Sequence, residues 1–356
     1  MRTGIANLPL HWGKTPPWLF NMMRRLARQI IEACVVEFGP HEFLRKIASP
    51  FWFQALGAVL GFDWHSSGLT TTVCAALKEG IKGIEKDIGI FIAGGKGKIS
   101  RKTPEEIDSY GKFIEIDPNK LIYASRMTAK VDSAGLQDGY TLYHHVFFFT
   151  ADGNWAVVQQ GMNELTRYAR RYHWIGEKVH DFVCEPHNAI CADKVHNKVL
   201  NMVASNSEQA RNMSTILARE KPDKVIQEIN KLNNLTLPQR HPILPDDINH
   251  KRLRKILIET YERQPENFEA LLSIKGVGAK TIRALSLVSE LIYGKQPSFK
   301  DPARFSFAHG GKDGYPYPVD KSNYETTIEV LERAISLAKI GNKEKLAAMR
   351  RLHNEL

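Results

Sequence analysis

Hydrophobic side chains recur at helical spacing through the first part of the chain. In residues 18–38, apolar positions such as Leu19, Met22 and Leu26 share one helical face, and Gly39-Pro40 ends the pattern. Further apolar runs, interrupted by Pro50, predict three more helices at residues 43–44, 51–60 and 69–82. The chain therefore opens with a helical section after a proline-rich start.

Two short runs of apolar residues, at residues 88–93 and 113–116, predict strands. The basic glycine loop Gly94-Gly95-Lys96-Gly97-Lys98 lies between them. Such a loop can cradle a phosphate, but it lacks the spacing of a Walker loop, and a solvated turn is the favoured interpretation. Thr103 and Glu106 then fit the capping box of a new helix.

The pattern of residues 140–162 predicts a β-hairpin. Aromatic and β-branched residues fill Tyr140 to Thr150, Ala151-Asp152-Gly153-Asn154 forms a turn, and Trp155 to Met162 returns. A two-residue turn at Asp152-Gly153 places Thr150 opposite Trp155. This hairpin is the clearest strand signal in the chain.

The same register gathers four polar side chains at the far end of an otherwise apolar ribbon. It pairs His145 with Gln160 on one face and turns His144 and Gln159 toward their neighbours. Buried polar groups need hydrogen-bond partners, so these side chains either bind one another and nearby backbone or line a site. Both interpretations stay open from the sequence.

A basic helix is predicted after the hairpin. Arg167, Arg170, Arg171 and Trp174 recur at helical spacing, with aromatic residues between them. Arginines can contact phosphates while aromatic rings stack on exposed bases, as single-strand grooves require. The alternative is a solvated helix whose aromatic side chains pack inward.

The second part of the chain reads as helical. Helices are expected within residues 207–231, with a break at Pro222, and then at 247–263, 324–340 and 344–352. Prolines among Asn and Asp make residues 233–247 a linker. We therefore predict an α+β protein of two domains. Residues 1–235 form a mixed domain with several helices and a small antiparallel sheet, and residues 236–356 form an all-helical domain.

Residues 271–281 carry the most specific motif of the chain. Two glycines, Gly276 and Gly278, allow a sharp turn, Val277 between them points into the core, and a helix with free N–H groups follows. The pattern Leu-x-x-Ile-x-Gly-Val-Gly-x-Lys-Thr resembles the helix-hairpin-helix element of DNA repair glycosylases, nucleases, ligases and polymerases. That resemblance implies backbone contacts to DNA from Lys275, Gly276, Val277, Gly278, Lys280 and Thr281.

Composition agrees with a nucleic-acid partner. The chain has 49 Lys and Arg against 39 Asp and Glu, a formal net charge of +10, which favours a polyanion. No apolar run reaches membrane-spanning length and no signal peptide opens the chain, so we expect a cytoplasmic protein without membrane contact.

Four residues near position 185 are spaced as two pairs of possible zinc ligands: His180, Cys184, His187 and Cys191. Only two residues separate the pairs, and Pro186 falls between them, whereas structural zinc sites place a longer loop there. Packing or surface roles are therefore favoured.

The whole chain also resembles the domain-of-unknown-function family 763 of archaeal and bacterial proteins. The resemblance rests on the Met-Arg-Thr-Gly-Ile-Ala opening, Asp63-Trp64-His65-Ser66-Ser67-Gly68, Tyr143-His144-His145 and residues 155–162. That family implies no mechanism.

Three functions fit these features, and a metal-dependent nuclease is favoured. A divalent ion, Mn²⁺ or Mg²⁺, would polarise the scissile phosphate and activate water. Its candidate residues are His144, His145, Gln160, Asp63 and His65, with Asp132 and Asp152 as possible partners.

The second function is a DNA glycosylase with strand-lyase activity, because Lys280 and Asp320 resemble the attacking lysine and assisting aspartate of hairpin glycosylases. Their separation is longer than that family's pattern has. The third is a protein that recruits a partner to damaged or branched DNA without cutting it.

Overall fold

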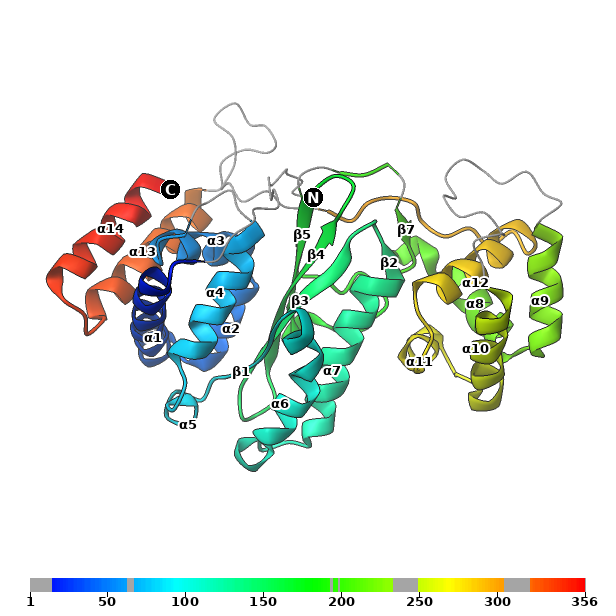
Figure 1. Cartoon of the computed structure of the whole chain (residues 1–356), viewed down its shortest axis with the longest axis horizontal. Coiled ribbons are helices and arrows are strands. Elements are labelled where there is room, and N and C mark those ends of the chain that lie inside the picture. Colours follow the sequence, from blue (N-terminus) through cyan, green and yellow to red (C-terminus); the bar gives the residue numbers. More distant parts are fainter. Residues whose placement is uncertain are drawn as a thin grey trace.

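The computed structural model describes residues 15–62, 67–192, 195–197, 199–232, 249–303 and 321–355. The chain is a mixed α+β protein, as predicted (Figure 1). Its longer helices are α1 (Pro17–Phe38), α2 (Pro40–Ala48), α3 (Pro50–Val59), α4 (Ser67–Gly80), α6 (Thr103–Ser109), α7 (Pro118–Lys130), α8 (Glu208–Arg219), α9 (Pro222–Lys231), α10 (His250–Arg263), α12 (Ala279–Leu291), α13 (Lys321–Leu337) and α14 (Asn342–Glu355).

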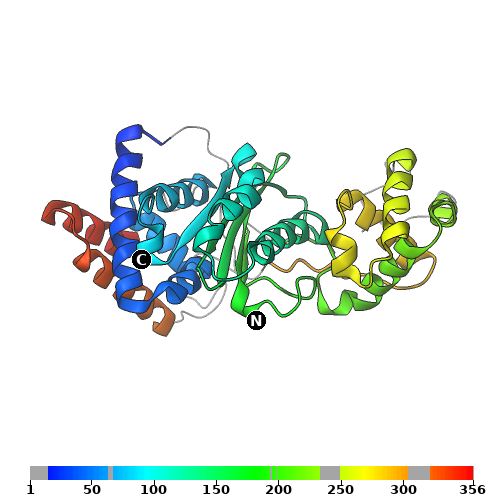
Figure 2. The same cartoon turned by 90° about the horizontal axis from the view of Figure 1, so that it is seen from below.

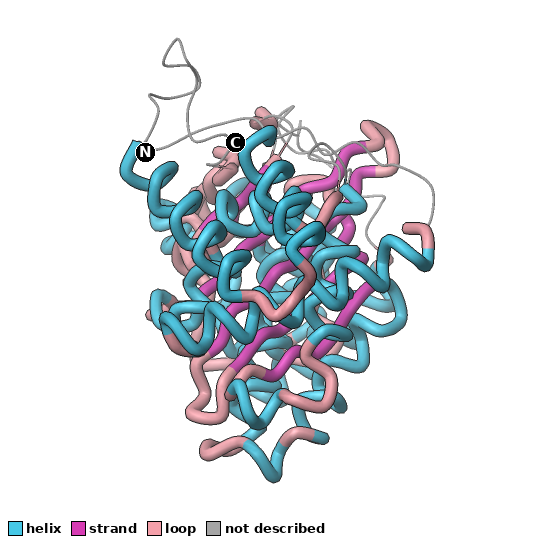
Figure 3. The backbone as a smooth tube through the Cα atoms, turned by 90° about the vertical axis from the view of Figure 1, so that its left-hand side faces the viewer, coloured by secondary structure: helices cyan, strands magenta, loops and turns pink. Residues whose placement is uncertain are grey.

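A five-stranded antiparallel sheet occupies the centre of the molecule, with strand order β1-β3-β4-β5-β6. The strands are β1 (Phe91–Lys96), β3 (Thr141–Phe149), β4 (Trp155–Asn163), β5 (Tyr168–Ile175) and β6 (Ala189–Cys191). Two short strands, β2 (Leu136–Gln137) and β7 (Leu200–Asn201), pair separately. Figure 3 shows the central strands crossing behind the helices that cover them.

Helices cover both faces of this sheet. One face packs under α1 to α4, and its core includes Val146, Phe148 and Val158. The other face packs under α6 and α7, and its core includes Phe147 and Val157. Because side chains alternate along a strand, an apolar run such as Phe147 to Phe149 is what a sheet buried on both faces requires.

The remaining helices add to these two layers from opposite ends (Figures 1 and 2). Helices α8 to α12, including the short α11 (Phe268–Ser273), share the apolar core of the α7 face. Helices α13 and α14 lie at the other end of the molecule, where they pack on α1 and α3.

The predicted boundary at residue 235 therefore does not separate two packing units. Helices α8 and α9, which precede it, contact α10 and α12, which follow it. Helices α13 and α14 return to the N-terminal helices instead of joining the hairpin region. The predicted linker 233–247 lies almost wholly outside the described residues, which resume at Asn249.

Most predicted helices are confirmed, and proline explains several of their starts. Helices α1, α2, α3 and α9 each carry Pro at the first helical turn, where a missing N–H costs no hydrogen bond. Helix α1 then ends at Gly39, whose φ of +82° suits glycine.

Two local predictions near β1 are wrong. Residues 113–116 are not a strand, because Gly111–Phe113 forms a 3-10 turn that leads toward α7. Thr103 does not cap α6, since its hydroxyl donates to the Ser100 carbonyl, and Glu106 binds the end of β1 instead.

No helix in the described part of the chain combines the length and apolar character needed to cross a bilayer.

Candidate functional site

A polar row crosses the whole central sheet on the face under α4. Its members are consecutive register partners on the five strands, namely Lys96, His144, Gln160, Arg171 and Cys191. The next row on the same face contains Val146 and Val158 and continues to the buried His173. Polar side chains in a buried row must find partners or meet a ligand.

The observed register corrects the predicted hairpin by one residue. The turn is longer than two residues, because the Thr150 N–H donates to the Asn154 carbonyl and Phe149 pairs with Trp155. His144 therefore pairs with Gln160, and His145 with Gln159. A shift of one residue moves each side chain to the other face, so the two histidines exchange surroundings relative to the prediction.

The N-terminal part of α4 covers the middle of the row. Gln160 Nε2 donates to the Ser67 carbonyl at 2.8 Å and also contacts the Tyr143 hydroxyl. Arg171 donates to Thr70 Oγ1 at 3.3 Å. Gln160 and Arg171 therefore fasten the helix to the sheet, and neither side chain is exposed.

At the His144 end, the row opens into a cavity of about 960 Å³. Its walls come from the start of α1, one side of α4, the end of β1 and the neighbouring strand β3. His144 and Lys96 line it, together with the backbone of Gly94 and Gly95. The sequence indicated both the histidine and the glycine loop as candidates, but it did not predict that they lie beside one another.

His144 is the most unusual group in this cavity. Its side chain is 1% exposed, and neither ring nitrogen has a hydrogen-bond partner among the described residues. Burial, with smaller contributions from His145 and Lys96, lowers the pKa of His144 to about 3. The ring is therefore neutral near pH 7 and offers one N–H donor and one acceptor.

The end of β1 is held rigidly beside this histidine. The Gly94 N–H donates to Glu106 Oε2 at 2.6 Å, and Lys78 Nζ donates to the Gly94 carbonyl at 2.8 Å. Lys78 also pairs with Glu106 at 2.6 Å. A side chain at Gly94 would collide with the His145 carbonyl, and its φ of +98° also favours glycine.

His145, the other candidate histidine, belongs to the opposite face and is fully bonded there. Its Nδ1 donates to Gln159 Oε1 at 2.8 Å, and its Nε2 accepts from the Ser125 hydroxyl at 2.9 Å. Gln159 Nε2 donates in turn to Asp132 Oδ2 at 2.6 Å. His145 is therefore part of a core network and does not line the cavity.

Asp132 is the centre of that network. It is fully buried and also accepts from Trp174 Nε1 at 2.9 Å and pairs with His187. Burial is the largest influence on its pKa, which is raised, and His187 opposes this shift. The sequence offered Asp132 and His187 as ligand candidates, and the structure places them together as partners of one another.

The predicted basic helix is wrong, since residues 168–175 form strand β5. Arg170 is fully buried and pairs with Asp138 at 2.9 Å and Asp301 at 2.7 Å. With Arg171 buried under α4, neither arginine can contact DNA. Arg167 is exposed in the turn before β5. The helical spacing gave the wrong element because distant partners allow these arginines to be buried on a strand: carboxylates bind Arg170, and Thr70 and Gln54 bind Arg171.

The remaining candidate residues either have protein partners or lie outside the described residues. Asp152 is engaged in its own turn, where Asn154 and His41 bind its carboxylate. Asp63, His65 and Asp320 lie outside the described residues, although Phe62 and Ser67, on either side of the first two, line the cavity.

The possible zinc ligands have different surroundings. His180 is exposed, His187 binds Asp132, and Cys191 ends the polar row beside Arg171. No group of three or more His, Cys, Asp or Glu in the described ranges is placed to hold a metal ion.

The glycine hairpin joins α11 to α12. Lys275, Gly276 and Lys280 are exposed, whereas Val277 is buried, as the sequence predicted. Gly276 has a φ of +95°, and α12 begins at Ala279 without a side-chain cap. Two exposed lysines and an uncapped helix start therefore lie in the same short segment.

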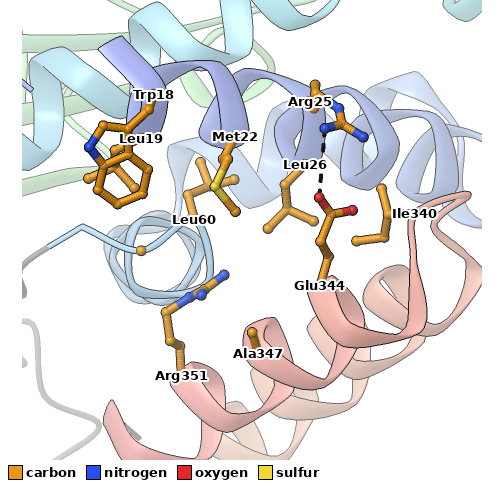
Figure 4. A pocket seen from close by; sticks show the side chains of 11 residues that line it. Trp18, Leu19, Met22, Arg25, Leu26, Leu60, Ile340, Glu344, Ala347 and Arg351 are labelled. Atoms are coloured by element: carbon orange, nitrogen blue, oxygen red, sulfur yellow. Dashed lines mark ion pairs between the residues drawn. The ribbon is translucent and has the colours of Figure 1, made fainter. Parts of the chain in front are cut away.

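A smaller pocket of about 210 Å³ lies between α1 and α14 (Figure 4). Apolar side chains such as Met22 and Leu26 form most of it. Its charged groups have protein partners: Arg25 pairs with Glu344 at 3.7 Å, and Arg351 donates to a backbone carbonyl. We interpret this pocket as a packing gap between helices.

Residues 4–319 match a family model described as a protein of unknown function (DUF763). The predicted family resemblance is thereby confirmed over most of the chain. Comparisons with curated proteins and with solved structures found no match.

Proposed function

Because this chain belongs to the DUF763 family, whose description names no activity, we propose its function from its own residues. It is a DNA-binding protein of repair or recombination that holds the DNA backbone with a helix-hairpin-helix at residues 271–281. It cuts that backbone as a nuclease, with the cavity at His144 as its catalytic centre.

The exposed hairpin is the observation that carries this proposal. Lys275 and Lys280 bring positive charge to either side of Gly276 and Gly278, where the backbone can approach a phosphate closely. The first N–H groups of α12 have no intrahelical acceptor, and the helix dipole favours an anion there. These groups suit a backbone phosphate and carry no base preference.

Contacts behind the hairpin hold it in one orientation. Lys130, at the end of α7, donates to the carbonyls of Ile274, at 3.2 Å, and Val277. Gln137 donates to the Ala279 carbonyl at 2.9 Å. The carbonyls of these hairpin residues thus have protein partners, and the backbone amides at the start of α12 remain for a ligand. A phosphate-binding site needs this preorganisation.

The cavity at His144 supports the catalytic half of the proposal. A buried polar side chain without a protein partner costs free energy unless a ligand supplies the missing hydrogen bonds. The exposed Lys96 lines the same cavity, and the exposed cations Lys98 and Arg101 follow it in the chain. A phosphate diester entering here would meet basic side chains first and the imidazole afterwards.

A divalent ion, Mn²⁺ or Mg²⁺, remains part of the proposal as a cofactor to be tested. The described residues include His144 but no set of three ligands for such an ion. No step of the cleavage is therefore assigned to the metal, and the residue role we propose is hydrogen bonding by His144 to the reacting phosphate or water.

The first prediction concerns the hairpin. Replacing Lys275 and Lys280 by alanine should weaken DNA binding at least tenfold near 0.1 M salt, because each lysine releases counterions when it neutralises a phosphate. Fluorescence anisotropy with a labelled duplex, read from 50 to 300 mM salt, measures this. The slope of log affinity against log salt should fall by about one for each lysine removed.

Lys343→Ala is the matched control, since Lys343 is exposed on α14 at the far end of the molecule. It makes the same charge change as Lys275→Ala or Lys280→Ala alone, and it should leave affinity within about twofold. An equal loss of affinity in the control and the hairpin variant would mean that binding depends on net charge alone and would contradict the hairpin assignment.

Cleavage is tested with the same protein and undamaged DNA, in Mn²⁺, Mg²⁺ or chelator. Metal-dependent products that His144→Gln abolishes and the hairpin variant only reduces would support the nuclease. Tight binding without product in any of these conditions would leave a recruitment protein in its place.

A further inference from the structure

The cavity at His144 has the size and lining of a site for one nucleotide. Its volume of about 960 Å³ lies in the range of small-ligand pockets. A base inside a duplex cannot reach such a recess, so proteins that act in one take the nucleotide out of the stack or bind a single strand.

The lining of the cavity has an apolar and a polar part. The apolar part, which we call the apolar wall, consists of Leu19, Phe20, Phe62, Val146 and Met162. Apolar and aromatic side chains suit the flat face of a base without selecting its identity. The polar part includes Lys96, Tyr143 and the start of α4 at Ser67 and Gly68. Lys96 and the start of α4 suit a phosphate, since the cation and the helix dipole have the same sign.

Negative charge at the cavity is limited by ion pairing. Glu79 lines it, and its carboxylate pairs with Lys82 at 3.3 Å. Glu106, next to the glycine loop, pairs with Lys78. Four exposed cations, Lys96, Lys98, Arg101 and Lys102, follow within one short turn of chain. An anionic strand is therefore favoured along the mouth.

His144 supplies the second, independent sign of a ligand. Both of its ring nitrogens are buried without a partner, and the residue lines the cavity. A neutral imidazole can donate one hydrogen bond and accept another, so it can bind the phosphate or a sugar hydroxyl of a nucleotide. Water or a protein group would otherwise have to satisfy both atoms.

We propose that this cavity receives one unpaired nucleotide of a DNA strand, with its base against the apolar wall and its phosphate toward Lys96 and the start of α4. The inference rests on the proposed DNA binding. It adds that the protein selects DNA with an extrahelical or single-stranded nucleotide over intact duplex.

The test compares three DNA probes: an intact duplex, the same duplex with one bulged 2-aminopurine, and a single strand containing 2-aminopurine. Chelator is present throughout to prevent cleavage. We expect the bulged and single-stranded probes to bind at least tenfold more tightly than the duplex. The fluorescence of 2-aminopurine should change on binding, since the base leaves its neighbours.

Ala75→Trp should fill the cavity, because Ala75 lines it from α4 and is partly exposed. The variant should bind duplex as the wild type does, while its preference for the bulge falls below twofold. Val36→Trp is the matched control, since Val36 is 86% exposed on α1, and it should keep the full preference. Circular dichroism establishes that both variants are folded. His144→Ala, which keeps the space, should reduce the preference about tenfold.

The outcomes separate this inference from the proposed function. Equal affinity for all probes in the wild type, or an unchanged preference in folded Ala75→Trp, would overturn the nucleotide site while leaving hairpin binding intact. Loss of the preference in Val36→Trp as well would also overturn it. Absence of binding to every probe would overturn the proposed function, and the inference with it.

Discussion

Two adjacent histidines have opposite surroundings because they lie on one strand. His144 faces α4 and lines the cavity, while His145 faces α7 and binds Gln159 and Ser125. The two side chains are chemically identical. Their surroundings differ because side chains alternate along β3 and because the turn is one residue longer than the sequence favours.

The burial of these histidines predicts how stability depends on pH. Burial lowers the pKa of His145 to about 4 and that of His144 to about 3, from the ordinary value of 6.5. The unfolded chain therefore binds more protons than the folded chain between these values and pH 6.5. The free energy of unfolding should rise with pH across this window, and stability should be lost as pH falls through it.

His145→Asn tests this dependence, because it removes one titrating ring from the core. Urea unfolding at pH 4.5, 5.5 and 6.5 should give a pH slope smaller by up to about 1.4 kcal/mol per pH unit. Val36→Ala, on the exposed side of α1, should keep the wild-type slope. A slope that does not change in His145→Asn would contradict the neutral buried state of this ring.

At the scale of elements, β5 shows why periodicity alone is insufficient. Arg167, Arg170, Arg171 and Trp174 have helical spacing, yet residues 168–175 are a strand. Helices on both faces of the sheet bury the two inner arginines. Each finds a partner far away in sequence, such as Asp301 for Arg170. A local sequence pattern does not reveal such distant partners, so it could not show that these arginines lie on a buried strand.

The end of β1 gives a prediction at the same scale. Gly94→Ala should destabilise the chain by about 3 kcal/mol or more, because the new methyl group meets the His145 carbonyl and lies 2.7 Å from Thr103 Oγ1. Gly97→Ala should cost only about 1 kcal/mol. Gly97 also has positive φ, but a methyl group there has no neighbour within 4 Å.

Chemical denaturation of the two alanine variants measures this difference, which isolates the close approach of β1 to β3 from the conformational preference of glycine. Equal losses would mean that backbone strain alone accounts for both positions.

For the whole molecule, the first and last helices that the structure describes pack together. Helices α13 and α14, which are last in sequence, cover α1 and α3, which are first. The hairpin region packs instead on the α7 side of the sheet. The described residues thus form two apolar cores, one on each face of one sheet, and a cut near residue 235 would divide the core on the α7 face.

Leu331→Ala tests this arrangement. Leu331 is fully buried in the core beneath α13, so its truncation should cost about 2–5 kcal/mol. Native-state hydrogen exchange should show faster opening in α1 and α3, with less change in α12. Equal acceleration in α12 would indicate a single cooperative unit instead of two cores that open separately.

The sequence by itself determined most helices, the strands of the β-hairpin and the family. These features depend on local periodicity, on proline and glycine, and on motifs whose parts are adjacent in the chain. Only the tertiary structure decided which histidine meets the cavity, that the glycine loop lies beside it, and that Arg170 is buried. Those outcomes depend on strand register and on partners from distant segments, and a register shift of one residue reverses every face. The sequence contains the reactive side chains, and the packing of helices on both faces of the sheet determines which of them reach the cavity or the surface.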